Sequence, residues 1–237
     1  MTTLISLRGV SKRYEATSQP ALESIDLDIE AGRITAIMGP SGCGKSTLLN
    51  LVGGLDRPTA GSIELDGVRV DKLSETAAAR FRRTKVGLVF QFFHLLDDLS
   101  VRDNVAVAAL LAGRSRAAAE QAADAMLGQL GLADRRAKFP ATLSGGERQR
   151  LAIARAVINQ PAVLLADEPT GALDSHNGEI ALSLLEDLNR RGQTILIVTH
   201  DEGLARRSAH RIVRLVDGAI AADAPGRAAD AAARAVA

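Results

Sequence analysis

The stretch from Gly39 to Thr47 constrains this chain more than any other. It reads Gly-Pro-Ser-Gly-Cys-Gly-Lys-Ser-Thr and fits the pattern G-x-x-x-x-G-K-[ST]. Residues 33–38 before it are apolar and β-branched enough for a buried strand, and the apolar residues after it recur at helical spacing. Strand, glycine-rich loop and helix are the context that a P-loop requires. The sequence therefore predicts a nucleoside triphosphate site rather than a glycine-rich turn that holds nothing.

The residue types of this loop explain how it would hold phosphate. Gly39, Gly42 and Gly44 let the backbone bend tightly, so that consecutive N–H groups face one anion. The following helix adds its positive end. Lys45 supplies a charge for the outer phosphates, and the Ser46 hydroxyl can ligate magnesium. We expect the whole loop to line the nucleotide, which adds Pro40, Ser41, Cys43 and Thr47.

Composition narrows the class of protein. The 237 residues are enough for one large domain or a compact pair of lobes, and the net charge of +1 gives no reason to expect nucleic acid as a partner. Cys43 is the only cysteine, which excludes an internal disulfide framework and fits a reducing compartment. We interpret it as a tolerated small residue, with a redox-sensitive thiol as the alternative. We expect neither a signal peptide in residues 1–10 nor a membrane span, since no apolar run approaches roughly 20 residues.

The remaining pattern predicts an α/β fold, a P-loop NTPase core with a mostly parallel sheet. Continuous apolar runs at 163–166 and 194–198 are typical of central parallel strands. The alternating residues of 25–30 and the hairpin signal Asp66-Gly67 indicate an antiparallel β subdomain. A helical subdomain is expected at about 92–160, where an alanine-rich pattern runs from 101 to about 132. We expect one domain over residues 1–220 and an alanine-rich tail, 221–237, that is either a solvated helix or disordered.

Two carboxylates end the apolar run at 163–166. Asp167 at the end of a buried strand can hold magnesium through water, and Glu168 lies one residue nearer the γ-phosphate. A carboxylate there can polarise the attacking water. The alternative, an acidic pair that caps the next turn, becomes unfavourable once the P-loop is present upstream.

Gln91 and His200 follow two other predicted strands. The long amide of Gln91 can reach both magnesium and the attacking water, and the imidazole of His200 can donate a hydrogen bond to a γ-phosphate. Each residue by itself is more often structural, so both assignments depend on the P-loop.

A second glycine-rich helix start lies at Ser144-Gly145-Gly146-Glu147. Such a start is an anion site, and one chain with one lysine-bearing loop does not need two. We therefore expect Ser144, Gly145 and Gly146 to serve the nucleotide of another subunit. The alternative is a plain capping motif, in which Ser144 pairs with Glu147 three residues later.

These motifs, in this order, resemble those of the nucleotide-binding subunit of ABC transporters. The resemblance covers residues 4–220 and implies the ABC ATPase fold, with ATP and magnesium as cofactors and a homodimer of ATPase subunits. It implies that Tyr14 stacks on adenine and that Asp174 belongs to the D-loop. The family's Walker A, Q-loop, signature, Walker B and switch positions are then Gly39–Ser46, Gln91, Leu143–Glu147, Val163–Glu168 and His200.

The chain departs from the family at Glu147, where the signature usually has glutamine. We expect the change to be tolerated, because Ser144 and the amides of Gly145 and Gly146 would make the phosphate contacts. Its effect on the rate of hydrolysis stays open.

A narrower resemblance connects the chain with the macrolide-export, lipoprotein-release and antimicrobial-peptide-resistance group. The segments 54–59, 90–96 and 167–175 carry it. It implies a bacterial protein bound peripherally at the cytoplasmic face of the cell membrane, with an FtsX-like permease as partner. Residues 92–105 would contact the permease through Phe92, Phe93, Leu95 and Leu96, although a buried loop explains any one of them equally well.

Three functions share these motifs. The first is an ATPase that powers a membrane permease through ATP-driven, head-to-tail dimerisation. The second is an ATP-gated module that signals across the membrane and moves no substrate. The third, a soluble ABC ATPase of DNA repair or translation, is disfavoured by the near-zero net charge and the single cassette. The sequence does not identify the transported substrate.

Overall fold

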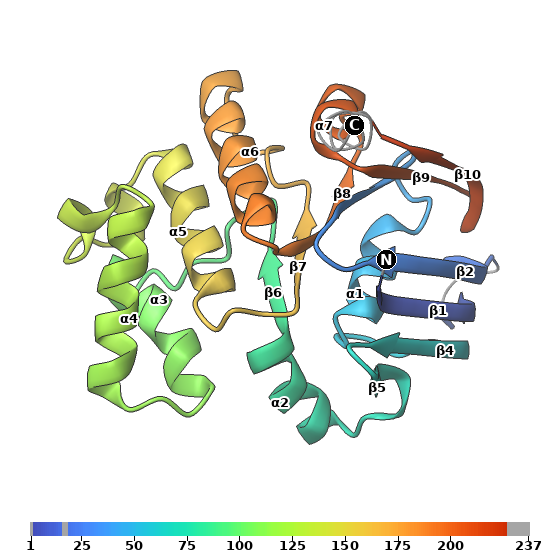
Figure 1. Ribbon diagram of the computed structural model, residues 1–237, viewed down its shortest axis with the longest axis horizontal. Coiled ribbons are helices and arrows are strands. Elements are labelled where there is room, and N and C mark those ends of the chain that lie inside the picture. Colours follow the sequence, from blue (N-terminus) through green and yellow to red (C-terminus); the bar gives the residue numbers. More distant parts are fainter. Residues whose placement is uncertain (1, 16–18, 227–237) are drawn as a thin grey trace. The chain divides into compact units, whose positions relative to one another are not determined.

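The computed structural model describes residues 2–15 and 19–226, which form two compact units (Figure 1). The first unit takes its residues from Met1–Ala78 and Glu186–Ala237, and the second from Ala79–Leu185. The P-loop and His200 therefore belong to the first unit, whereas Gln91, Ser144 and the carboxylate pair at 167–168 belong to the second.

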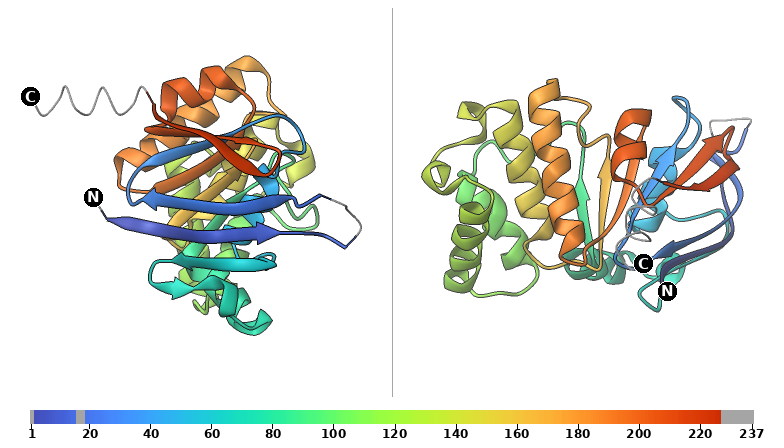
Figure 2. Two further views of the ribbon diagram at one scale, coloured as in Figure 1. Left: turned by 90° about the vertical axis from the view of Figure 1, so that its right-hand side faces the viewer. Right: turned by 45° about the horizontal axis from the view of Figure 1, so that its top comes forward.

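The predicted antiparallel subdomain is present in the first unit. Its strands are β1 (Thr3–Lys12), β2 (Leu22–Glu30), β4 (Ala60–Leu65) and β5 (Val68–Arg69), in the order β2-β1-β4-β5. Figure 2 shows β1 and β2 running side by side. In β2 the alternation expected from the sequence buries Ile25, Leu27 and Ile29, while Asp26 faces solvent. Strand β1 is ten residues long and lies between β2 and β4.

The second sheet of the first unit carries the P-loop. Its strands follow the order β10-β9-β3-β8, with β3 (Ile34–Met38) parallel to both β8 (Thr194–Thr199) and β9 (Arg211–Val216). Every residue of β3 and β8 is buried, as expected for central parallel strands. Helix α1 (Lys45–Val52) follows the P-loop, and β10 (Ala219–Pro225) pairs antiparallel with β9.

The second unit contains the expected helical subdomain. Helices α3 (Val101–Leu111), α4 (Arg116–Gln129) and α5 (Gly145–Val157) pack on one another around buried alanines and leucines (Figure 1). Strand β6 (Val86–Val89) is parallel to β7 (Val163–Asp167). Helix α6 (Ser175–Arg190) follows β7, and short 3-10 turns lie at Ala133–Arg135 and Pro140–Thr142.

Several expectations about local structure were incomplete. The single helical stretch at 101–132 is two helices, because the chain turns at Gly113, whose φ of 98° a glycine adopts without strain. Helices α2 (Glu75–Lys85) and α7 (Glu202–Ser208) and the 3-10 turn Val70–Lys72 were not expected from the sequence. Residues 221–225 belong to β10 rather than to a helical or disordered tail, and residues 227–237 lie outside the described part. Within the described residues, no helix has the length and apolarity to span a bilayer.

Candidate nucleotide site

The predicted P-loop turns at glycines with positive φ. Gly44, which precedes α1, has a φ of 102°, a left-handed conformation that favours glycine. A Cβ at this position would also collide with the carbonyl oxygen of Ala21. The loop therefore needs glycine here both for its turn and for its close contact with the residues before β2.

The start of α1 is open to an anion. Helices α3, α4, α5 and α7 each begin at a residue whose side chain accepts a hydrogen bond from the backbone, whereas α1 has no such cap and no acidic residue in its first turn. The Lys45 ammonium donates to the carbonyl oxygens of Gly39 and Pro40, both at 2.8 Å. The charge of Lys45 is thus held at the loop, beside the positive end of the helix.

His200 and the P-loop leave the sheet at the same edge. Met38, the last residue of β3, is paired in register with Thr199, the last residue of β8. Gly39 and His200 follow these residues directly. The carboxyl ends of neighbouring parallel strands are the usual binding position in such sheets, so the pairing brings the predicted γ-phosphate ligand to the phosphate loop.

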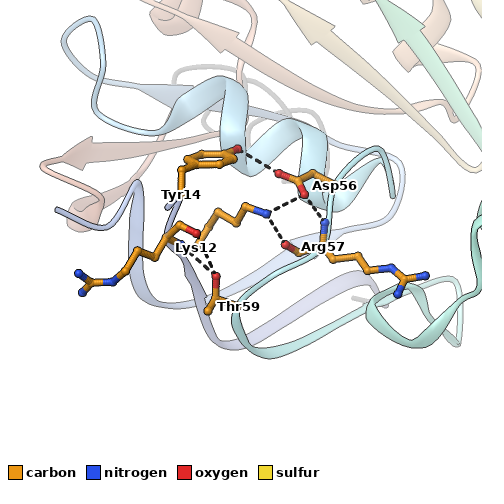
Figure 3. A network of polar contacts seen from close by, with 6 residues as sticks. Lys12, Tyr14, Asp56, Arg57 and Thr59 are labelled. Carbon is orange, nitrogen blue, oxygen red and sulfur yellow. Dashed lines mark hydrogen bonds and ion pairs between the residues drawn. The ribbon is translucent and has the colours of Figure 1, made fainter. Parts of the chain in front are cut away.

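Tyr14 lies just beyond the end of β1, and backbone contacts connect that end with the P-loop. The Ala21 N–H donates to the Lys12 carbonyl oxygen at 2.8 Å, and the Ala21 carbonyl lies against Gly44. The Tyr14 side chain is 38% exposed. Figure 3 shows its hydroxyl directed at Asp56, to which it donates a hydrogen bond at 3.0 Å.

The second unit brings Gln91 and Glu168 together. Val89 of β6 is paired with Ala166 of β7, so both residues follow neighbouring strands at one edge. A Cβ on Gly171 would lie 3.0 Å from Nε2 of Gln91 and 3.4 Å from Cβ of Glu168, which places both side chains beside this glycine. Glu168 has a φ of 46°, an uncommon value for glutamate that is typical of strained functional positions.

The turn at Ser144 forms the capping box that the sequence left as an alternative. Ser144 Oγ accepts from the Glu147 N–H at 3.3 Å, and Glu147 Oε2 accepts from the Ser144 N–H at 2.8 Å. Arg135 also donates to Glu147, at 2.9 Å. These hydrogen bonds lower the pKa of Glu147, and the one from the backbone N–H of Ser144 has the largest effect. Glu147 is thus part of the structure that begins α5.

The same turn packs against the residues that follow β7. A Cβ on Gly146 would collide with the side chain of Asn177, and one on Gly145 would contact Leu173 at 3.4 Å. Asn177 in turn donates to both carboxylate oxygens of Asp174, at 2.8 and 2.7 Å. Both hydrogen bonds lower the pKa of Asp174, and the one from the backbone N–H of Asn177 has the larger effect. The structure therefore joins the predicted signature and D-loop, and it uses the Asp174 carboxylate to cap α6.

The donors predicted for magnesium fit that ion chemically. Ser46, Gln91 and Asp167 offer a hydroxyl, an amide oxygen and a carboxylate, all hard oxygen ligands. No group of three or more His, Cys, Asp or Glu side chains in the described residues could hold a metal ion. Few protein ligands are expected for magnesium, which keeps several waters and is bound with substrate phosphates.

Sequence reasoning missed the residues that support these positions. Lys12 and Asp56 hold Tyr14, and Asn177 holds Asp174. Asp56 lies in the segment 54–59, which is one of the segments that carried the narrower family resemblance. That resemblance was the only feature of the sequence that pointed to Asp56. Arg155 donates to the carbonyl oxygens of His94 at 2.6 Å and Phe93 at 2.8 Å, and nothing in its sequence context indicates that contact.

Comparisons with known proteins identify the family and fold of this chain. A family model described as "ABC transporter" matches residues 22–171. The macrolide export ATP-binding/permease protein MacB of Escherichia coli is 48% identical over 228 residues, which are 95% of this chain but 35% of that protein. The chain thus spans about a third of the length of this relative. The lipoprotein-releasing system ATP-binding protein LolD of Bacteroides thetaiotaomicron is 48% identical over 93% of this chain and 100% of its own length.

Two solved structures of the ATP-binding cassette MJ0796 are similar to this fold. A dimeric structure shares 40% identity with a TM-score of 0.85, and it covers 94% of this chain and 98% of that one. A dimeric post-hydrolysis state bound to ADP and Pi has 39% identity, the same TM-score and the same coverage.

Proposed function

Because this chain belongs to the ABC transporter family and is an ATPase of a transport system, we propose that it powers a membrane permease through ATP-dependent pairing of two copies. One observation carries this proposal: the chain builds two glycine-rich helix starts, Gly39–Thr47 before α1 and Ser144–Gly146 before α5. One nucleotide per chain needs only the first. The second would cover the nucleotide of a facing, head-to-tail copy, and the dimeric state of the related MJ0796 cassette supports this assignment.

The proposed roles follow from the chemistry of the side chains. Lys45 and the amides of α1 bind the phosphates, and Tyr14 stacks on the base. Ser46, Gln91 and Asp167 would hold magnesium, which would neutralise charge on the phosphates when bound. Glu168 takes a proton from the attacking water, an effect of order 10²–10⁴ in rate. His200 donates a hydrogen bond to the γ-phosphate.

ATP then acts as a reversible link between two copies. A ligand that binds only the closed dimer stabilises it by mass action. Ser144, Gly145 and Gly146 of each copy bind the γ-phosphate held by the other. Hydrolysis removes that contact, so the dimer opens.

The second unit carries a surface suited to a permease segment. A pocket of about 370 Å³ lies among β6, α3 and α5, and its lining includes Phe90, Leu111 and Arg155. Leu111 is 56% exposed, Phe92 70% and Leu96 45%, whereas Phe93 and Leu95 are partly buried. Of these three exposed residues, Leu111 lines the pocket, and exposed apolar side chains are typical of a protein interface. We assign this surface to an FtsX-like permease, which would hold the chain at the cytoplasmic face of a bacterial membrane.

The dimerisation step is tested with Glu168→Gln, which keeps the shape of the side chain and removes the base. Sedimentation of the purified protein with ATP and magnesium should show a dimer for this variant, while its ATPase rate falls by at least about 100-fold. Adding Ser144→Arg to Glu168→Gln should return the protein to monomer. Hydrolysis by Glu168→Gln at the wild-type rate would refute the base assignment, and a monomer with ATP would refute the pairing.

The partner is tested by purification of tagged Glu168→Gln from membranes with ATP. We expect an FtsX-like permease, with less recovered after Phe92→Ser. Phe139 is 49% exposed and lies elsewhere in the second unit, so Phe139→Ser is the matched control and should recover the same amount. Ribosomes or soluble proteins alone would contradict the membrane assignment. Substrate transport by the reconstituted complex would separate a motor from a signalling module.

A further inference from the structure

A polar network holds the ring of Tyr14 in place. The Tyr14 hydroxyl donates to Oδ2 of Asp56 at 3.0 Å, and the Lys12 ammonium donates to Oδ1 of the same carboxylate at 2.7 Å. The Lys12 ammonium also lies over the Tyr14 ring, 4.8 Å from its centroid. Figure 3 shows the three side chains converging, so Asp56 fixes one end of the ring and Lys12 one face.

Asp56 belongs to the turn that follows the P-loop helix. Its backbone N–H donates to the Asn50 carbonyl oxygen at 3.3 Å, as does the N–H of Leu55 at 2.9 Å. The Arg57 N–H donates to Oδ1 of Asp56 at 2.7 Å, which orients the carboxylate, and Lys12 donates to the Arg57 carbonyl at 2.8 Å. The turn that follows the P-loop helix thus supplies the residue that holds Tyr14.

The Lys12–Asp56 pair is well shielded for a pair near the surface. The Lys12 side chain is 13% exposed and that of Asp56 is 31% exposed. Burial raises the pKa of Asp56, but the hydrogen bonds from Lys12, Arg57 and Tyr14 together outweigh it and leave the pKa below the ordinary value. The carboxylate is therefore ionised at neutral pH, and a charged acceptor gives the Tyr14 hydroxyl a stronger bond than a neutral one.

We propose that Asp56, together with Lys12, is a positioning residue for nucleotide recognition: it locks the Tyr14 ring at a set place relative to the P-loop, so that the base of a bound nucleotide meets an already ordered stacking surface. The proposal rests on the role of Tyr14 in the proposed function. A locked ring loses less conformational freedom when the base binds, which increases affinity without adding a contact to the ligand.

The hydroxyl of Tyr14 separates this role from stacking. Tyr14→Phe keeps the aromatic face and removes the bond to Asp56. Calorimetry on the full chain with ATP and magnesium should show about three- to tenfold weaker binding for Tyr14→Phe, a range that corresponds to the net contribution of one ordinary hydrogen bond. Asp56→Ala should weaken binding by a similar factor, and the double variant should be no weaker than the weaker single variant.

Inorganic tripolyphosphate serves as a probe that has the phosphates of ATP but no adenine ring. Its affinity should stay within about twofold of wild type in every Tyr14 and Asp56 variant, since the phosphate loop is unchanged. Asp28→Asn is the matched control, because it removes an Arg8–Asp28 ion pair from the same antiparallel sheet and should leave ATP binding unaltered. Melting temperatures identify any variant that fails to fold, and Tyr14→Phe, which deletes one oxygen, keeps the test usable if Asp56→Ala does not fold.

The outcomes separate this inference from the proposed function. Wild-type ATP affinity in Tyr14→Phe would overturn the positioning role. The role would also be overturned if the loss of ATP affinity in the double variant equalled the product of the two single losses. Wild-type affinity in Tyr14→Ala would instead show that Tyr14 is no stacking surface at all. An equal loss of tripolyphosphate binding would mean that Asp56 supports the P-loop rather than the ring.

Discussion

Arg135 donates a hydrogen bond from its Nε to Oε1 of Glu147 at 2.9 Å. The contact joins a 3-10 turn to the first turn of α5 and occupies the position where related signatures have glutamine. The other carboxylate oxygen caps the helix through the Ser144 amide. A glutamine can reproduce the cap but not the ion pair, so the glutamate stabilises the start of α5 in two ways.

Glu147→Gln should lower the free energy of unfolding by about 0.5–1 kcal/mol at pH 7, the loss of one partly exposed ion pair. The folded state lowers the pKa of Glu147 from its usual 4.5, so its contribution is complete above that value and is lost as the pH falls through the lower, folded pKa. Denaturation of both proteins between pH 7 and pH 3 should show the difference disappearing in acid. The exposed pair Arg116–Glu120 supplies a control, because Glu120→Gln should change stability by less than about 0.5 kcal/mol. A difference that does not shrink as the pH falls would contradict this account.

Gly146→Ala should destabilise the chain by about 1–3 kcal/mol, since the new Cβ would displace Asn177 and with it the hydrogen bonds to Asp174. Gly178 lies in α6, where a Cβ would make only an ordinary contact with Thr170 at 3.7 Å. Gly178→Ala should therefore stabilise the chain by about 0.5–1 kcal/mol through helix propensity. Denaturant titrations measure both, and equal effects of the two substitutions would refute the steric explanation.

Arg155→Ala should loosen residues 92–96. Its guanidinium binds the carbonyl oxygens of two residues with positive φ, Phe93 at 62° and His94 at 48°. Arg155 is partly buried, and this burial lowers the pKa of its guanidinium. We expect about 1–3 kcal/mol of destabilisation and faster amide exchange in this segment. Arg155→Lys should recover part of it. Unchanged exchange in Arg155→Ala would mean that the loop is held by other contacts.

Asn104→Ala should cost about 2–4 kcal/mol of stability, because the side chain is completely buried and hydrogen-bonds to backbone N–H and carbonyl groups of the preceding loop. Its Oδ1 accepts from the Leu96 N–H at 2.8 Å, and its Nδ2 donates to the Leu96 and Leu99 carbonyls at 2.9 and 3.0 Å. Asn104→Asp keeps the acceptor but loses the donors and adds a buried charge, so thermal unfolding should show it to be at least as unstable as the alanine variant. A tolerated aspartate would overturn this reasoning.

Local sequence pattern determines much of this protein. The P-loop, the buried strand before it and the capping box at Ser144 are each encoded within a few residues, because glycine conformations and hydrogen-bonding offsets depend on near neighbours. The family predicted from the order of the motifs is confirmed, as are the α/β fold and the ATPase activity. The site residues and the permease partner stay predictions. Helix α2 was missed because most of its residues are polar, and α7 because it has only seven residues.

Tertiary structure alone decided which residues support the site. Tyr14 and Asp56 are 42 positions apart, and Arg155 lies 61 positions from His94. A hydrogen bond across such separations leaves no periodic trace in the sequence, since it depends on how strands and helices pack rather than on neighbouring residues. The register that sets Met38 opposite Thr199, and so brings His200 to the P-loop, has the same origin. The sequence alone determined which groups can do the chemistry, and folding determined which distant side chains hold them in place.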